Sequence, residues 1–211
     1  MNALIPLLGS VLLATACSAP LDVPFYRSAA LTPEWLEAST ANSPSTHRVA
    51  RFELVDQHRT KITTDSLQHR ATVIHFFFTT CGGVCPTAQT NIARLLAGMP
   101  DEARVQVLSH SVAPERDSVA ALQTYASLHH IKDARWHLLT GPRADIERLA
   151  RDSYFVNLND GTSYGVSNLA HTETLVLVDG QGRLRGMYTG SLPLDIARLS
   201  EDIRSVLKEA Q

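Results

Sequence analysis

The stretch Thr80-Cys81-Gly82-Gly83-Val84-Cys85-Pro86-Thr87 places two thiols between an apolar run and an amphipathic run. The apolar run, residues 73–78, has turn signals at both ends and predicts a strand buried on both faces. The amphipathic run, residues 88–99, has apolar residues at helical spacing and stops at a glycine and a proline. Pro86 suits the first helical position, because the N–H that it lacks would be unpaired there. The stretch is therefore predicted to be a loop between a strand and a helix.

The two thiols of this loop have the chemistry of a soft metal site. Cys81 and Cys85 are spaced Cys-x-x-x-Cys, one residue longer than the redox Cys-x-x-Cys. A helix N-terminus favours thiolate over thiol at Cys85. The spacing lets both sulfurs face one side, and Gly82 and Gly83 let the loop curl. Two thiolates select Cu(I), zinc or an iron–sulfur cluster, and two sulfurs rarely complete a site. We therefore expect a third ligand from elsewhere in the chain.

Nine histidines could supply that ligand. His171 is the best placed, because it ends a long polar connection, residues 153–170, and precedes the apolar run at residues 175–178. A connection of this length in a compact domain is often functional. From spacing alone, a surface histidine remains the alternative for His171. His75, inside the first buried strand, is expected to be a core histidine with a hydrogen-bond partner. The weaker candidates are His110, His129, His130 and His137.

The rest of the chain predicts strands alternating with helices. Residues 48–56 and 61–64 are separated by a polar turn and predict a hairpin. Further strands are expected at residues 105–108, 136–139, 175–178 and 183–188. Further helices are expected at residues 115–130, with Val119, Leu122, Tyr125 and Leu128 on one face, after Pro142 and from Pro193. Alternation of this kind implies a parallel core with right-handed crossovers. Thiols between the first parallel strand and its helix lie where a thioredoxin-like fold places its chemistry. We predict an α/β, thioredoxin-like fold: a central mixed sheet flanked by helices, with an N-terminal hairpin and an inserted loop before His171.

Composition and charge exclude several classes of function. The chain has 211 residues, a formal net charge of −2 and 44% hydrophobic residues, as in an ordinary globular protein. This charge gives no electrostatic reason to expect nucleic acid or an anionic membrane as a partner. Three cysteines are too few for a disulfide framework. Since Cys17 lies far from the other two, the cysteines divide into one residue and one pair.

The N-terminal residues predict export from the cytoplasm. Residues 1–16 are mostly small and apolar, too short to span a bilayer comfortably, and predict a signal peptide. Residues 13–17, Leu-Ala-Thr-Ala-Cys, resemble a bacterial lipobox, in which Cys17 is acylated and becomes the mature N-terminus. The absence of Lys and Arg before this run leaves a plain secretory signal as the alternative. We expect a lipid-anchored protein on the periplasmic side of a bacterial membrane, or secretion to the periplasm. Residues 17–46, rich in Ala, Ser, Thr and Pro, predict a tether before the domain at residues 47–211.

Several segments together carry a resemblance to the SCO/SenC family. Residues 76–86, Phe-Phe-Phe-Thr-Thr-Cys-Gly-Gly-Val-Cys-Pro, resemble the copper-binding loop of that family. The other similar segments are Ser111-Val112-Ala113-Pro114-Glu115-Arg116-Asp117-Ser118, Leu138-Leu139-Thr140-Gly141, His171-Thr172-Glu173 and residues 175–180. The resemblance runs from about Arg51 to Leu207 and covers the whole globular part. Two positions depart from it: Ala113 stands where many members carry Asp, and Thr172 replaces the serine common after the histidine.

The resemblance implies a thioredoxin fold and a copper site made by Cys81, Cys85 and His171. Two thiolates and one imidazole suit three-coordinate Cu(I), whereas Cu(II) would need a fourth donor such as water. Binding needs reduced thiols and a neutral imidazole, so it should weaken as the pH falls. A Cys81–Cys85 disulfide would abolish the site. The partners implied are a copper-donor protein and the copper subunit of cytochrome c oxidase, with the membrane reached through the lipid on Cys17.

Three functions stay open at this point. The first is a metallochaperone, a binding protein rather than an enzyme, that delivers copper toward the binuclear copper centre of cytochrome c oxidase. The second is a thiol–disulfide oxidoreductase that uses Cys81 and Cys85 as its redox pair. The extra residue in the motif, and the lack of a proline before the strand at residues 175–178, count against it. The third is a peroxidase, but Gly82 and Phe78 stand where peroxiredoxins have Thr or Ser and Pro.

Overall fold

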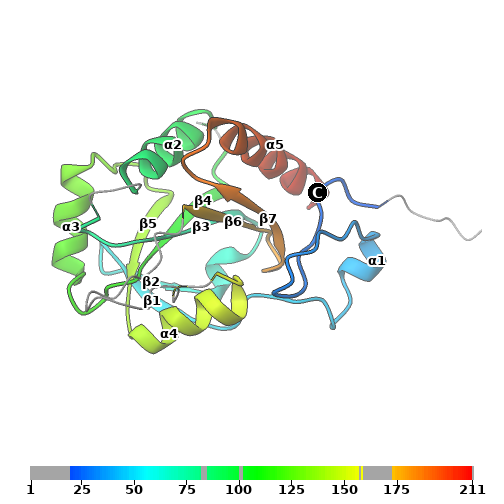
Figure 1. Cartoon of the computed structure of the whole chain (residues 1–211), viewed down its shortest axis with the longest axis horizontal. Helices are drawn as coiled ribbons and strands as arrows, with labels where there is room; N and C mark the ends of the chain where they lie inside the picture. Colours follow the sequence, from blue (N-terminus) through cyan, green and yellow to red (C-terminus); the bar gives the residue numbers. More distant parts are fainter. Residues whose placement is uncertain (1–19, 82–84, 100–101, 157, 159–172, 211) are drawn as a thin grey trace, which may run out of the picture.

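The protein forms one mixed sheet with helices on both faces (Figure 1). The computed structural model describes residues 20–81, 85–99, 102–156, 158 and 173–210. The strands are β1 (Glu53–Asp56), β2 (Lys61–Thr63), β3 (Ala71–Phe77), β4 (Val105–Ser111), β5 (Trp136–Thr140), β6 (Thr174–Val178) and β7 (Leu184–Thr189). Their order in the sheet is β2-β1-β5-β4-β3-β6-β7. β3, β4 and β5 pair in parallel, and the outer strands pair antiparallel. The predicted parallel core and N-terminal hairpin are therefore confirmed.

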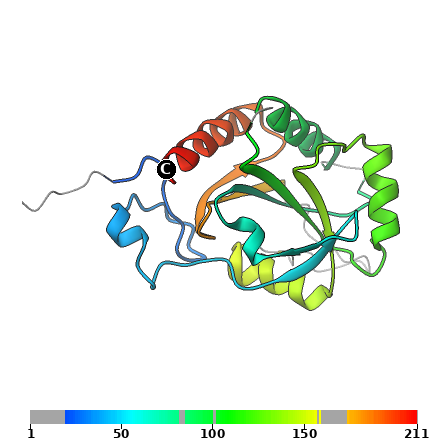
Figure 2. The same cartoon turned by 180° about the vertical axis from the view of Figure 1, so that it is seen from behind.

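The helices divide between the two faces of the sheet. They are α1 (Ala38–Ala41), α2 (Cys85–Ala97), α3 (Val119–Leu128), α4 (Arg143–Arg148), which continues as the π-helix η2 (Leu149–Ser153), and α5 (Pro193–Glu209); η1 (Thr64–Leu67) is a 3₁₀ turn. The helices α2, α3 and α5 pack on one apolar cluster of the sheet, and α4 with η2 packs on the other. Figure 2 shows from behind that α4 lies on the opposite side of the sheet from α2 and α5.

The central strand β3 explains why the sheet is covered on both faces. All seven of its residues are buried. Val73 and Phe77 face the cluster under α2, α3 and α5, whereas Ile74 and Phe76 face the cluster over α4. Successive side chains of a strand point to opposite faces, so a continuous apolar run is stable only between two layers. This burial holds in place the strand that leads into the thiol loop.

The helix α3 differs from its prediction in both its start and its buried face. It begins at Val119, because the Ser118 side chain accepts a hydrogen bond from the Ala121 N–H at 3.3 Å and caps the helix. Leu122 and Tyr125 are buried as expected, but Leu128 is 71% exposed. Leu128 lies six residues after Leu122, which turns its side chain about 120° away from the buried direction.

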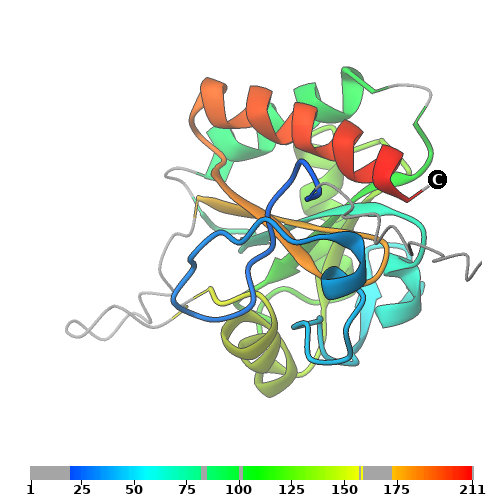
Figure 3. The same ribbon diagram turned by 90° about the vertical axis from the view of Figure 1, so that its right-hand side faces the viewer.

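Residues 20–46, predicted to be a tether, pack against the domain. Val23, Phe25 and Ala41 are buried, and the Tyr26 N–H donates to the Leu184 carbonyl of β7 at 3.0 Å. Figure 3 shows this segment crossing the edge strand β7. We call residues 20–46 the N-terminal strap. An apolar side chain such as Phe25 gains free energy by leaving water, and composition alone did not reveal that a site exists to receive it.

The predicted signal peptide and the lipobox cysteine Cys17 lie outside the described residues. Among the residues that the structure does describe, no helix is both long and apolar enough to cross a membrane.

Candidate functional site

The structure describes part of the predicted metal site. Cys81 follows β3, is 9% exposed and is disulfide-bonded. Cys85 is the first residue of α2, but its side chain is not described, and neither is Cys17. His171 and most of the connection before it also lie outside the described residues. Among the described side chains no group of three His, Cys, Asp or Glu residues could hold a metal.

Two paired strands of the sheet, β3 and β6, adjoin the predicted site residues Cys81 and His171 in the sequence. β3 runs toward Cys81, and β6 begins three residues after His171. The two strands pair antiparallel, with Ile74 opposite Val176. In an antiparallel pair, the end of one strand lies beside the start of the other. The end of β3, which leads to Cys81, and the start of β6, which follows His171, therefore lie side by side at the same end of the sheet.

A turn after β7 joins the start of β6 to the first turns of α2. The Gly190 N–H donates to the Glu173 carbonyl at 2.6 Å, and the Asn91 side-chain amide donates to the Gly190 carbonyl at 2.8 Å. A Cβ at position 190 would lie 3.0 Å from the Glu173 carbonyl oxygen and 3.1 Å from the Ala88 Cβ. Only a glycine fits without a shift of these neighbours. Gly190 therefore lies between Glu173, two residues after His171, and Ala88 of α2, three residues after Cys85.

A buried carboxylate positions the loop before Cys81. Asp117 is 1% exposed and accepts hydrogen bonds from the Thr79 N–H at 3.1 Å and the Thr79 hydroxyl at 2.6 Å. It also accepts one from the Ser111 hydroxyl at the end of β4 at 2.5 Å. Hydrogen bonds to an ionised acceptor are stronger than those between neutral groups. Asp117 therefore ties the thiol loop to the neighbouring parallel strand. Sequence reasoning gave it no role, although it lies in a segment that carries the family resemblance.

A buried tyrosine connects Asp117 to the helix that begins at Cys85. Burial raises the pKa of Tyr125, and the Asp117 carboxylate raises it further, so the phenol stays neutral. The Gln89 side-chain amide of α2 donates to the Tyr125 hydroxyl, and the Phe77 ring lies 5.3 Å from the Tyr125 ring. Gln89 comes four residues after Cys85, one helical turn further on. The first turns of α2 are therefore packed against α3 as well as against the Gly190 turn.

The remaining histidine candidates lie in other places. The expectation for His75 is confirmed: it is buried, and its Nδ1 lies 3.2 Å from the Ser109 hydroxyl. Burial lowers the pKa of His75 to about 4, helped by His110, and burial also lowers the pKa of His110 to about 4. His137 Nδ1 lies 3.0 Å from an Asp56 carboxylate oxygen. The His129 ring packs 4.2 Å from the Tyr125 ring. Each of these rings has a structural contact of its own.

Comparisons with known proteins agree with the fold and with the family resemblance. The SCO1/SenC family model matches residues 40–208. A protein of Stutzerimonas stutzeri whose name describes it as copper-binding is 30% identical over 187 residues, 88% of each chain. The SCO1 protein homolog of Bacillus subtilis is 24% identical over 164 residues, 77% of this chain and 84% of its own.

Solved structures show the same architecture. Bradyrhizobium japonicum ScoI, solved with copper bound, superposes with a TM-score of 0.61 at 30% identity, over 74% of this chain and 98% of its own. A SCO1/SenC family lipoprotein from Bacillus anthracis superposes with a TM-score of 0.67 at 23% identity, over 76% and 95% of the two chains. The predicted thioredoxin-like α/β fold is confirmed.

Proposed function

Because the chain belongs to the SCO1/SenC family, we propose that it binds copper outside the cytoplasm and delivers it during assembly of cytochrome c oxidase. The proposed ligands are the thiolates of Cys81 and Cys85 and the imidazole of His171. The proposed acceptor is the oxidase subunit that carries the binuclear copper centre, and a second protein supplies the copper. The protein is a carrier of the metal, so copper is its cargo.

The Gly190 turn is the observation that supports this proposal most. Gly190 bonds to Glu173 on one side and to Asn91 of α2 on the other, so a single residue links the backbone two residues after His171 to the helix that starts at Cys85. Asp117 restrains the third element, the loop that ends at Cys81, through Thr79. The loop before Cys81, the helix from Cys85 and the distant start of β6 are thus each restrained by a contact next to a predicted ligand. Two sulfurs and one imidazole form a soft donor set that suits Cu(I).

Copper binding and the redox state of the thiols depend on one another. Cys81 is disulfide-bonded in this structure, and a disulfide sulfur cannot act as a thiolate ligand. Loading therefore requires two-electron reduction of that bond by an external thiol donor, and the metal then displaces the thiol protons, which are released to water. Protonation of the imidazole competes with copper, so we expect the affinity to fall as the pH drops.

We also propose that Cys17 is acylated and anchors the protein to the periplasmic side of a bacterial membrane. The support is the lipobox-like sequence at residues 13–17 and the apolar run before it. Mass spectrometry of the mature protein tests this, because acylation adds hydrocarbon chains that Cys17→Ser must lose.

Anaerobic titration of the reduced protein with Cu(I), against a competing chelator, tests the copper site. The wild type should take up copper at one site, and Cys81→Ser, Cys85→Ser and His171→Ala should each lose tight binding. His58→Ala is the matched control, since His58 is exposed and outside the predicted site. X-ray absorption of the copper-loaded protein should show two sulfurs and one nitrogen. Full Cu(I) binding by both Cys81→Ser and His171→Ala would refute the proposal.

A thiol–disulfide oxidoreductase is the second candidate, and the disulfide at Cys81 favours it. In that reaction a thiolate of the reduced pair attacks a target disulfide, the second thiol resolves the mixed disulfide, and two electrons pass to the target. A periplasmic thiol donor would have to reduce the pair again. The reduction potential of the pair separates the candidates: a potential too low for any such donor to maintain would exclude catalytic turnover and leave copper binding intact.

A further inference from the structure

The N-terminal strap is a folded hairpin rather than a free chain. The Leu21 N–H donates to the Leu36 carbonyl at 3.0 Å. Phe25 and Glu34 exchange two backbone hydrogen bonds of 2.8 and 3.0 Å. The limb at residues 21–25 therefore runs antiparallel to the limb at residues 34–36, and residues 28–33 form the loop between them. Trp35 lies in the second limb, one residue from the partner of Leu21.

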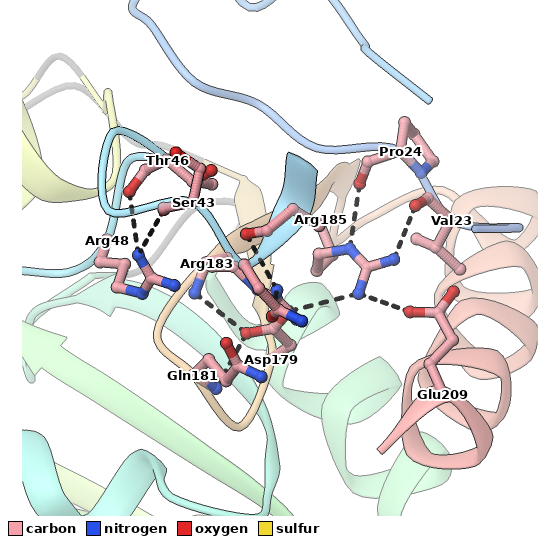
Figure 4. A network of polar contacts seen from close by, with 12 residues as sticks. Val23, Pro24, Ser43, Thr46, Arg48, Asp179, Gln181, Arg183, Arg185 and Glu209 are labelled. Atoms are coloured by element: carbon pink, nitrogen blue, oxygen red, sulfur yellow. Dashed lines mark hydrogen bonds and ion pairs between the residues drawn. The ribbon is translucent and has the colours of Figure 1, made fainter. Parts of the chain in front are cut away.

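Arg185 of β7 locks this hairpin to the domain (Figure 4). Arg185 donates to the Val23 carbonyl at 2.6 Å and to the Pro24 carbonyl at 3.2 Å, and its guanidinium lies 4.0 Å from the Phe25 ring centroid. Arg185 is 1% exposed and also pairs with Asp179 at 3.2 Å and with Glu209 at 2.7 Å. A buried guanidinium with this many partners holds its neighbours rigidly.

Arg183, one residue before β7, fastens the C-terminal part of the strap. Arg183 donates to the Ala41 carbonyl at 3.2 Å and to the Asn42 side-chain oxygen at 3.0 Å. It also donates to the Asp179 carboxylate at 2.7 Å. The strap is therefore held at both ends by one charge network, and the domain effectively begins within a few residues of Pro20.

This shortens the linker to the proposed lipid on Cys17. Only residues 18 and 19 separate Cys17 from Pro20. Three peptide steps reach at most about 11 Å when fully extended. A lipid on Cys17 would thus hold Pro20, the first residue of the strap, within about 11 Å of Cys17 at the head groups. The domain would not hang on a long tether.

The loop that closes the hairpin, at the end opposite Pro20, presents an uncharged surface. Residues 28–33, Ser-Ala-Ala-Leu-Thr-Pro, are all exposed and carry no charge. Trp35 is 57% exposed and Leu31 is 38% exposed. The two charges that flank the loop neutralise one another, since Arg27 donates to the Glu34 carboxylate at 3.0 Å. Asp22 and Glu37 add two acidic residues near the other end of the hairpin. Tryptophan is favoured at the boundary between lipid and water, where its ring meets both.

We propose that residues 28–33 and Trp35 form a membrane-contact surface that lies in the head-group region of the bilayer holding the Cys17 lipid. This inference rests on the lipid anchor proposed above. The lipid supplies the attachment, and the strap surface sets the orientation of the domain.

This orientation directs the thiol loop away from the lipid. The C-terminal end of α5 lies at the strap through Glu209, and its N-terminal end follows the Gly190 turn beside α2. The 17 residues of α5 span about 25 Å between these ends. In Figure 1 the strap and the C-terminus lie at one side of the domain and α3 at the other. A partner domain in the aqueous phase would then reach the thiol loop without displacing the strap.

Tryptophan fluorescence tests the contact, using the full chain purified with its lipid and reconstituted in vesicles of phosphatidylethanolamine and phosphatidylglycerol. The chain has two tryptophans, and Trp136 is buried with its indole N–H donating to Ser109 at 2.9 Å. Iodide in solution therefore quenches mainly the fluorescence of Trp35. Compared with the unlipidated Cys17→Ser protein, iodide quenching should fall several-fold in the vesicles, and brominated lipids should quench the emission.

The matched control combines Trp35→Ser with Leu128→Trp, because Leu128 is exposed on α3, far from the strap. Its probe should stay accessible to iodide and insensitive to brominated lipid. If the lipidated protein floats with the vesicles but Trp35 remains as accessible as in Cys17→Ser, the contact surface is refuted and the anchor stands. If the protein carries no lipid and does not float, the contact surface and the lipid anchor are both refuted. Copper titration of the same preparation reports on the copper site independently of either result.

Discussion

The strap end and the thiol end of the domain hold buried carboxylates in different ways. At the strap end, Asp179 accepts hydrogen bonds from the guanidiniums of Arg183 and Arg185, so opposite charges are buried together. At the thiol end, Asp117 accepts from the Thr79 N–H and from the hydroxyls of Thr79 and Ser111, which are uncharged donors. The two guanidiniums neutralise the charge of the Asp179 carboxylate. The uncharged donors around Asp117 leave its charge in place and fix the position of the carboxylate relative to Thr79 and Ser111.

This difference separates stability from positioning. Removing one partner from a buried charge network leaves the others uncompensated, which is costly for the fold. Hydrogen bonds from neutral donors to a carboxylate contribute less, but they place the donors closely. We conclude that the strap end holds the domain together, whereas the thiol end sets the position of the loop before Cys81. Four predictions test this contrast.

The largest effect is expected from Arg185→Met. This change leaves Glu209 and two strap carbonyls without their buried partner and removes one of the two guanidiniums paired with Asp179, so the free energy of unfolding should fall by about 3–5 kcal/mol. Urea denaturation measures the change. Lys61→Met removes an exposed ion pair with Glu53 and should leave the urea midpoint unchanged. The Cu(I) affinity of the folded Arg185→Met protein should equal that of the wild type, and a matching loss of affinity would show that the two ends are coupled.

Asp117→Asn should change both stability and metal affinity. The amide keeps the shape of the carboxylate but loses its charge and turns one acceptor into a donor. The free energy of unfolding should fall by about 1–3 kcal/mol. The Cu(I) affinity should fall about 10–100-fold, as when a partner behind a metal ligand is removed. Chelator competition measures the affinity, with Asp145→Asn as control, because the Asp145 side chain is 44% exposed. An unchanged affinity would make Asp117 a purely structural residue.

Gly190→Ala tests the junction between α2 and the start of β6. The added methyl group would meet the Glu173 carbonyl and the Ala88 Cβ at 3.0 and 3.1 Å. Such overpacking should cost about 1–3 kcal/mol of unfolding free energy. Gly98→Ala is the matched control, because its Cβ would have its nearest neighbours at 3.4 and 3.5 Å, and it should stay within about 0.5 kcal/mol of the wild type. Equal stability of the two variants would contradict the close contact at Gly190.

The smallest effect belongs to Asp56, a buried carboxylate away from both ends. Burial alone raises the pKa of Asp56, but hydrogen bonds from His137 and from the Thr60 and His58 N–H groups outweigh it and hold the pKa below its ordinary value. The ionised form is therefore favoured in the folded state. Its contribution is present above the unfolded pKa, near 3.8, and is lost as the pH falls through the lower folded value.

Urea midpoints measured from pH 7 down to pH 3 test this sign. Wild-type stability should drop at the acid end, and Asp56→Asn should remove about 1 kcal/mol of that dependence. A steeper acid loss in the variant than in the wild type would contradict the assignment.

Much of the architecture followed from local patterns. The continuous apolar run of β3 predicted a strand between two layers, and its link to a helix through Cys81 and Cys85 predicted the parallel core. The prediction for His75 also held, since a histidine inside such a run needs a buried partner. The signal for α3 was weaker at its ends. There the cap at Ser118 and the turn of the helix decided which side chains are buried, and Leu128 was placed on the wrong face.

The thiol motif, the strand-to-helix order and the soft donor types were thus set by residues close together in the chain. Only the tertiary structure decided which distant residues restrain them. Thr79 meets Asp117 38 residues away, Asn91 meets Gly190 99 residues away, and Arg185 meets Val23 162 residues away. Local composition made the strap resemble a tether, because its few buried side chains have no periodic pattern. Its place on β7 depends on arginines that become buried only when the sheet and α5 have assembled around them.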